Sequence, residues 1–135
     1  MNMIRRLLVI AVLLFTSFPA LGQSEIAGRW QAMAAANGPW VIELEVKGAS
    51  VTGNVRQGGA TSEPVPIYFG SIEGNKVRFK ANSPDGDRIV TFTGTITRAE
   101  IGFARAVEIR PGGTRGDTGI FGANAVSFFV ARRAQ

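Results

Sequence analysis

Any chemistry in this chain has to come from a short list of side chains, because the sequence contains no histidine and no cysteine. Ser-His-Asp and Cys-His nucleophile systems are therefore excluded. Zinc sites built from His or Cys ligands are excluded as well. Carboxylates, lysines and a single tyrosine remain. This inventory predicts a protein that is not an enzyme and that uses no cofactor.

Two carboxylates stand close together in Pro84-Asp85-Gly86-Asp87. An Asp-x-Asp pair can bind Ca²⁺ or transfer protons. Pro-Asp-Gly between two strands is also a common turn signal, and no downstream glutamate completes an EF-hand loop. We therefore expect a turn at this position and no metal site.

Arg105 is the most unusual residue, because alternation along its strand places it on the same face as Ile101 and Phe103. Arg88 begins the apolar face of the preceding strand, which continues through Phe92. A buried guanidinium without a partner is costly. One hypothesis is that Arg105 anchors the anionic head of a ligand, with Arg88, Phe92 and Phe103 around it. The alternative is an internal ion pair with a loop carboxylate, or a side chain that reaches water at the rim.

Short strands joined by tight turns must position these residues. Val, Ile, Phe and Thr are frequent, and Gly stands at the breaks. One hairpin pattern, two branched apolar residues flanking a polar turn, occurs three times, at 46–51, 72–77 and 96–101. We expect eight strands, at about 26–33, 39–46, 51–57, 65–72, 76–82, 87–97, 100–109 and 125–132.

Alternation of apolar and polar residues assigns the buried face of each strand. It predicts a core containing Trp30, Trp40, Phe69, Phe79, Phe92, Phe103 and Phe128. On the last strand it places Val126, Phe128 and Val130 on one apolar face, and it leaves Tyr68, Phe121 and Phe129 outside the core or in loops. A sheet with one apolar face must close on itself or stack. We therefore predict an all-β, eight-stranded antiparallel up-and-down meander barrel, with a two-sheet β-sandwich as the alternative.

The N-terminal segment has the features of a secretory signal peptide. Arg5 and Arg6 precede the apolar run 7–15, and small residues precede a cut after Gly22. The run is short for a membrane span. We expect cleavage, no stable membrane insertion afterwards, one domain over 23–135, and a secreted or periplasmic location. The net charge of +5 is scattered along the chain, which does not favour nucleic-acid binding.

Gly28-Arg29-Trp30 resembles the G-x-W motif of lipocalin- and avidin-like (calycin) barrels. In lipocalins this Trp packs at the closed end of the barrel beneath an Arg from near the C-terminus. The resemblance implies that role for Gly28 and Trp30, with Arg132 or Arg133 as the arginine. The chain is more closely similar to a group of short secreted bacterial meander proteins with repeated hairpins and a terminal F-x-A-x-R, a group with no established activity.

These features predict a secreted, non-catalytic binding module that holds a small apolar or anionic amphiphilic ligand in its barrel. The alternative is a structural or interaction protein of the cell envelope with a filled core and no ligand. In that case its contact surface would include Phe121, Tyr68 or the loop 110–123. The expected partner is accordingly a small amphiphile or an envelope protein, with no nucleic acid.

Overall fold

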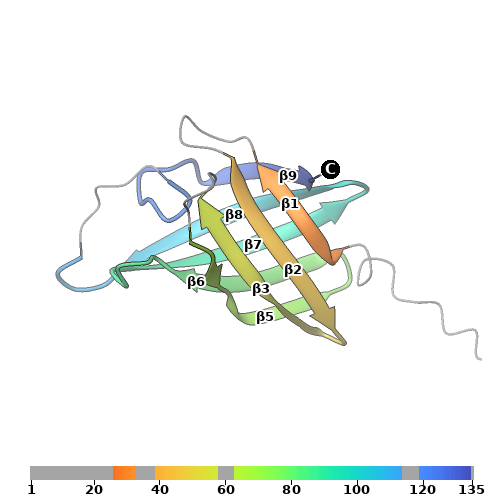
Figure 1. The fold of residues 1–135 in the computed structure, drawn as a ribbon, viewed down its shortest axis with the longest axis horizontal. Helices are drawn as coiled ribbons and strands as arrows, with labels where there is room; N and C mark the ends of the chain where they lie inside the picture. The colour runs from red at the N-terminus through yellow and green to blue at the C-terminus, as the bar shows by residue number, and fades with distance from the viewer. Residues whose placement is uncertain (1–25, 33–38, 58–62, 114–118, 135) are drawn as a thin grey trace, which may run out of the picture.

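The computed structural model describes residues 26–32, 39–57, 63–113 and 119–134, so the expected signal peptide lies outside the described residues. It contains nine strands (Figure 1): β1 Gly28–Ala32, β2 Trp40–Lys47, β3 Ser50–Gln57, β4 Val65–Pro66, β5 Tyr68–Glu73, β6 Lys76–Asn82, β7 Arg88–Thr97, β8 Glu100–Ile109 and β9 Phe128–Arg133.

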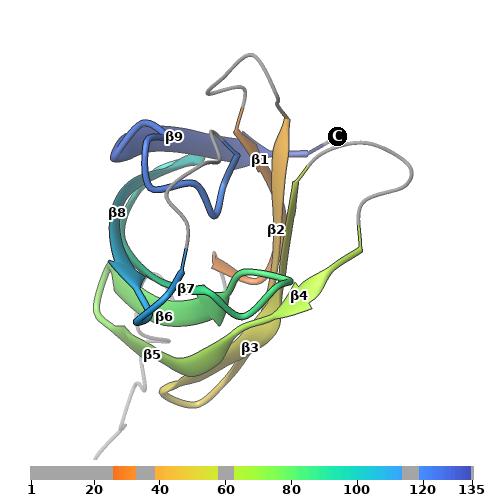
Figure 2. The ribbon, with the colours of Figure 1, turned by 90° about the vertical axis from the view of Figure 1, so that its left-hand side faces the viewer.

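The strands form one antiparallel sheet that closes on itself (Figure 2). The order is β2-β1-β9-β8-β7-β6-β5-β3-β4, and a further pairing between β2 and β3 completes the ring. Eight strands make up the ring, and the two-residue strand β4 pairs with β3 beside it. Each strand of the ring neighbours the strands before and after it along the chain. The prediction of an all-β up-and-down meander barrel is confirmed.

The three repeated patterns form the hairpins β2–β3, β5–β6 and β7–β8, each with a two-residue turn. The first turn residue has a positive φ in all three: 60° at Gly48, 59° at Gly74 and 55° at Arg98. This geometry fits a type II′ turn, whose first central position favours glycine. Arg98 is therefore the only one of the three that bears a Cβ in this strained conformation.

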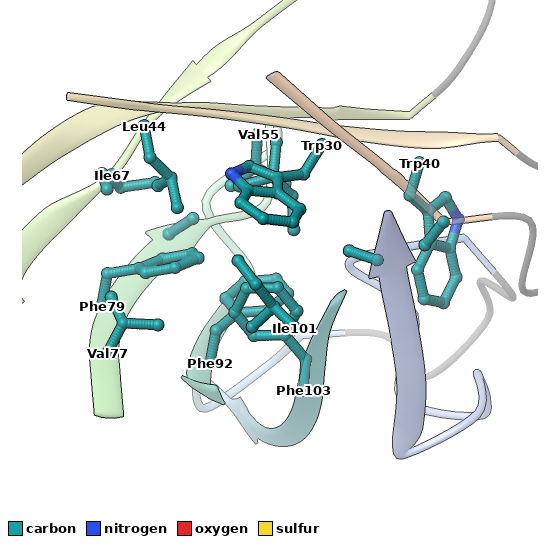
Figure 3. Packing of buried hydrophobic residues seen from close by; sticks show 14 of the residues in the cluster. Trp30, Trp40, Leu44, Val55, Ile67, Val77, Phe79, Phe92, Ile101 and Phe103 are labelled. Atoms are coloured by element: carbon teal, nitrogen blue, oxygen red, sulfur yellow. The ribbon is translucent and has the colours of Figure 1, made fainter. Parts of the chain in front are cut away.

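The inward-facing side chains fill the barrel with a single apolar cluster. Trp30, Phe79 and Phe92 are completely buried and point toward one another from different strands (Figure 3). The Phe79 and Phe92 rings stack with centroids 5.0 Å apart, and Phe103 meets Phe79 edge-on at 5.8 Å. The predicted inward faces of β2, β6, β7 and β8 are confirmed, because side chains alternate strictly along paired strands.

The predicted strand 65–72 was wrong in two respects. It is divided into β4 and β5, which are separated by Ile67, and the pairing of β5 with β6 is irregular between Tyr68 and Ser71. Phe69, expected in the core, is 80% exposed and has a φ of 52°. The irregular pairing breaks the two-residue alternation on which the prediction depended.

The inward face of β9 was also predicted incorrectly. Phe129 and Ala131 point into the core, whereas Phe128 and Val130 face outward. Pairing with β8 sets this register, because Phe129 lies opposite the inward-facing Phe103. A shift of one residue exchanges the two faces of a strand, and apolar residues occupy both faces of this one.

Candidate functional site

Arg105 is buried, with 7% of its surface exposed, and it points inward as predicted. Its guanidinium donates hydrogen bonds to the carbonyl oxygens of Ile120 (2.6 Å), Gly122 (2.8 Å) and Val126 (3.1 Å). Desolvation lowers the pKa of Arg105 to about 10, while the three carbonyl acceptors favour the charged form. Arg105 is therefore cationic at neutral pH. Its partners are main-chain carbonyls of residues 120–126, where the hypothesis of an internal pair had named a loop carboxylate.

These bonds hold the segment 119–127 across one end of the barrel (Figure 2). Ile120 and Phe121 belong to the buried core, and the Ile120 amide donates to the side-chain oxygen of Gln57 at 2.7 Å. The Arg105 amide also donates to the Ser127 carbonyl at 2.7 Å. Phe121, which the interaction hypothesis placed on a contact surface, is thus part of the core instead.

Arg88 begins the inward face of β7 and is buried near the turn that precedes this strand. One of its terminal nitrogens lies 3.7 Å from the Asp85 carboxylate. The Ser83 hydroxyl donates to that carboxylate at 2.5 Å, and the Asp87 amide donates to it at 3.1 Å. These hydrogen bonds, with Arg88, lower the pKa of Asp85. Asp85 therefore helps to organise a turn, which is the role that the Pro-Asp-Gly signal predicts.

The four residues proposed to bind a ligand come from one wall of the barrel, formed by β7 and β8. Arg105 lies directly opposite Phe92 in the pairing of these strands. Phe92 and Phe103 pack against each other with ring centroids 6.3 Å apart, and Phe103 stacks on Phe129 at 5.2 Å. The Arg105 guanidinium lies over the Trp40 ring at 5.5 Å. The aromatic side chains near Arg105 are thus already packed against other core rings or against Arg105 itself.

Trp30 packs inside the barrel, and an arginine from the last strand lies over its ring. The residue is Arg133, whose guanidinium is 4.6 Å from the Trp30 ring centroid and donates to the Ala27 carbonyl at 2.9 Å. The structure thus places Arg133 at this position, and Arg132 faces outward, paired with Glu100 at 2.9 Å. Gly28 accommodates this packing, because a Cβ there would lie 2.8 Å from the Arg133 guanidinium.

In two neighbouring rows, the outer surface of β6 to β9 carries one type of side chain on each strand. Pairing aligns these strands in rows. One row contains Lys76, Thr95, Gly102 and Val130, and the next contains Arg78, Thr93, Ala104 and Phe128. The columns are therefore basic on β6, hydroxyl on β7, small on β8 and apolar on β9. On these four strands neither row contains a carboxylate, but Glu73 on β5 lies opposite Lys76, and the row that adjoins that of Lys76 contains Glu100.

A groove of about 500 Å³ follows these rows and is lined by Thr93, Thr95, Gly102, Ala104, Phe128 and Val130, among others. We call these six residues the β7–β9 outer face. Phe128 and Val130, 78% and 49% exposed, form a ridge on its edge. A Cβ on Gly102 would meet no atom within 4 Å. The absence of a side chain at that point deepens the groove beside the ridge.

The sequence prediction missed this face, because it assigned Phe128 and Val130 to the core. Two signals were nevertheless available. Thr91, Thr93, Thr95 and Thr97 alternate along β7, and Gly102, Ala104 and Ala106 alternate along β8. Both sets lie on the outward face of their strands, because they alternate with the inward residues. They therefore identify a stretch of small and hydroxyl side chains on the outer surface of two neighbouring strands, bounded on β8 by Glu100 and Glu108.

Within the described ranges, no group of three or more His, Cys, Asp or Glu side chains is placed to hold a metal ion. No helix among the described residues is long and apolar enough to span a membrane. Comparisons of the chain with protein-family models, curated proteins and solved structures find no match. The class of this protein is therefore defined by its own structure, an eight-stranded up-and-down barrel whose interior holds an aromatic cluster.

Proposed function

We propose that this protein is a non-catalytic binding module that uses its barrel as a rigid scaffold and binds through the β7–β9 outer face. The observation that carries the proposal is the pair Phe128 and Val130, exposed beside a groove floored by Gly102 and Ala104. Contiguous exposed apolar surface commonly marks an interaction site. The signal-like segment 1–22 supports a place of action outside the cytoplasm, secreted or periplasmic.

The packing of the interior favours this surface over a ligand inside the barrel. An eight-stranded barrel has room either for side chains or for one small ligand. Here Phe79, Phe92 and Phe103 form mutual ring contacts across the interior. Arg105, which the ligand hypothesis uses as an anchor, instead donates to three carbonyls. A ligand in the barrel would have to displace these contacts.

The two locations can be distinguished with decanoate, an anionic amphiphile, as the probe below its micelle concentration. We expect amide resonances of Gly102, Thr93 and Val130 to shift in a ¹H–¹⁵N NMR titration. Phe128→Asp should abolish those shifts, whereas Lys47→Asp, a control on an exposed residue at the end of β2, should retain them. Shifts confined to interior residues such as Phe92 would favour a ligand in the barrel. That outcome, or no shift at all, would refute the proposal.

A further inference from the structure

Basic side chains lie on both sides of the apolar ridge formed by Phe128 and Val130. On one side, past the groove, Lys76 and Arg78 are exposed on β6 and occupy the same rows as the ridge residues. On the other side, a second groove of about 440 Å³ is lined by residues that include Arg132 and Arg133. Arg132 is paired with Glu100. Lys76 lies opposite Glu73 in the pairing of β5 with β6, so the positive charge facing a partner comes chiefly from Arg78.

The shape of this surface favours a broad and soft partner over a small enclosed ligand. Phe128 and Val130 project between two grooves on the outer surface of a barrel, and Val126, 45% exposed, borders the second groove. A single small molecule in either groove would leave much of the ridge in water. An extended surface that accepts the ridge would remove all three apolar side chains from water at once.

We infer that the partner of the β7–β9 outer face is the surface of a lipid bilayer that contains anionic lipids. This inference rests on the proposed function. Basic side chains close to such a surface are attracted to its negative potential. A second copy of the chain would instead bring Lys76 and Arg78 close to like charges, which opposes association. Charge therefore favours the bilayer over the dimer.

In this arrangement the ridge enters the boundary between head groups and acyl chains, as the apolar face of an interfacial protein does. The small column of Gly102 and Ala104 lets the barrel wall approach the head groups closely. The Thr93 and Thr95 hydroxyls face lipid phosphate and ester oxygens, which accept hydrogen bonds. Lys76 and Arg78 extend from the next strand toward the phosphates, with their aliphatic stems along the wall. The protein docks on the membrane without spanning it.

A tryptophan placed on the ridge tests this geometry at one residue. Trp30 and Trp40 are completely buried, so Phe128→Trp adds an exposed indole that reports on its own surroundings. With vesicles of phosphatidylcholine and phosphatidylglycerol, we expect its emission to shift to the blue and its quenching by acrylamide to fall. Vesicles of phosphatidylcholine alone should produce a much smaller response. A local reporter is needed because residues 1–22, where retained, are themselves apolar enough to bind lipid.

The charge requirement is tested in the Phe128→Trp background. Arg78→Glu should weaken the vesicle response about tenfold or more, since each basic side chain near an anionic surface contributes roughly fivefold and this substitution reverses the charge. Lys47→Glu makes the same kind of charge change at the β2–β3 hairpin and should leave the response within about twofold. Raising the salt concentration should also weaken vesicle binding by the Phe128→Trp protein that retains Arg78.

Three results would overturn the inference. The first is no response of the indole at 128 to anionic vesicles while decanoate still shifts the outer-face resonances, in which case the proposed function stands and the bilayer does not. The second is an equal response to neutral and anionic vesicles. The third is a concentration-dependent dimer, detected by analytical ultracentrifugation and abolished by Phe128→Asp, without a vesicle response. A failure of both decanoate and vesicles would reject the proposed function itself.

Discussion

Replacement of Arg105 by methionine should destabilise the barrel more than any other single arginine substitution on the described strands. Methionine preserves most of the apolar stem and removes the guanidinium. Three main-chain carbonyls, those of Ile120, Gly122 and Val126, then lose their donor. The cation–π contact with Trp40 is lost as well.

The magnitude follows from the number of bonds and from their burial. A hydrogen bond to a charged group contributes about 1.5–3 kcal/mol. All three bonds are donated by one buried cation. Its replacement also removes the free-energy cost of burying that charge, so the total loss is smaller than the sum of the three bonds. We expect a loss of about 3–5 kcal/mol in the free energy of unfolding. For a domain of this size the melting temperature should fall by roughly 10–20 °C.

Denaturant unfolding followed by tryptophan fluorescence provides the assay, together with hydrogen exchange at the main-chain amide of residue 105. That amide donates to Ser127 and should exchange faster once the segment 119–127 is released. Arg105→Lys keeps the charge but lacks the planar guanidinium, so it should lower the free energy of unfolding by an intermediate amount. Arg132→Met is the matched control. Its ion pair with Glu100 is exposed, and such pairs contribute less than about 1 kcal/mol.

Arg105 does not secure the segment 119–127 if Arg105→Met unfolds within about 1 kcal/mol of the parent protein, a loss no larger than that of an exposed pair. The same conclusion follows if Arg132→Met loses as much stability as Arg105→Met. Loss of stability without faster exchange at the Arg105 amide would mean that the guanidinium acts elsewhere than on the segment 119–127.

Three further predictions concern the strands and turns. Gly94→Ala should cost about 1–3 kcal/mol in a urea melt, because its new methyl would lie 2.8–2.9 Å from three core side chains, whereas Gly102→Ala enters open space and should cost nothing. Arg98→Gly should raise the denaturant midpoint by the equivalent of about 1 kcal/mol without changing m, since it relieves a φ of 55°; a fall in the midpoint would contradict the turn assignment. Asp85→Asn should lower stability at neutral pH. The hydrogen bonds from Ser83 and the Asp87 amide lower the pKa of Asp85 in the folded state, so its contribution is present above the unfolded pKa and is lost as the pH falls through the folded pKa. Melts of the two proteins should therefore converge as the pH falls into acid, and a gap that does not narrow at all on acidification would refute this role.

Alternation with period two was sufficient to predict the inward faces of β2, β6, β7 and β8, because most of the large apolar residues of each strand share one parity, with Val41 and Ile89 as exceptions. It failed on β9, where Phe128 and Phe129 offer an apolar residue on either face. The pairing of Phe129 with Phe103 selects between them. The candidate site was missed for the same reason, since its ridge consists of the residues that were assigned to the core.

The order of residues along the chain was enough to predict a meander of hairpins, because strand alternation and turn preferences are local properties of neighbouring residues. It was also enough to predict that Arg105 points inward, since alternation along one strand settles that question. The partners of Arg105 became known only from the folded chain, because main-chain carbonyls have no signature in side-chain identity. The alignment of basic, hydroxyl, small and apolar columns on the outer wall likewise depends on the register between strands, which is a property of their pairing and of no single segment.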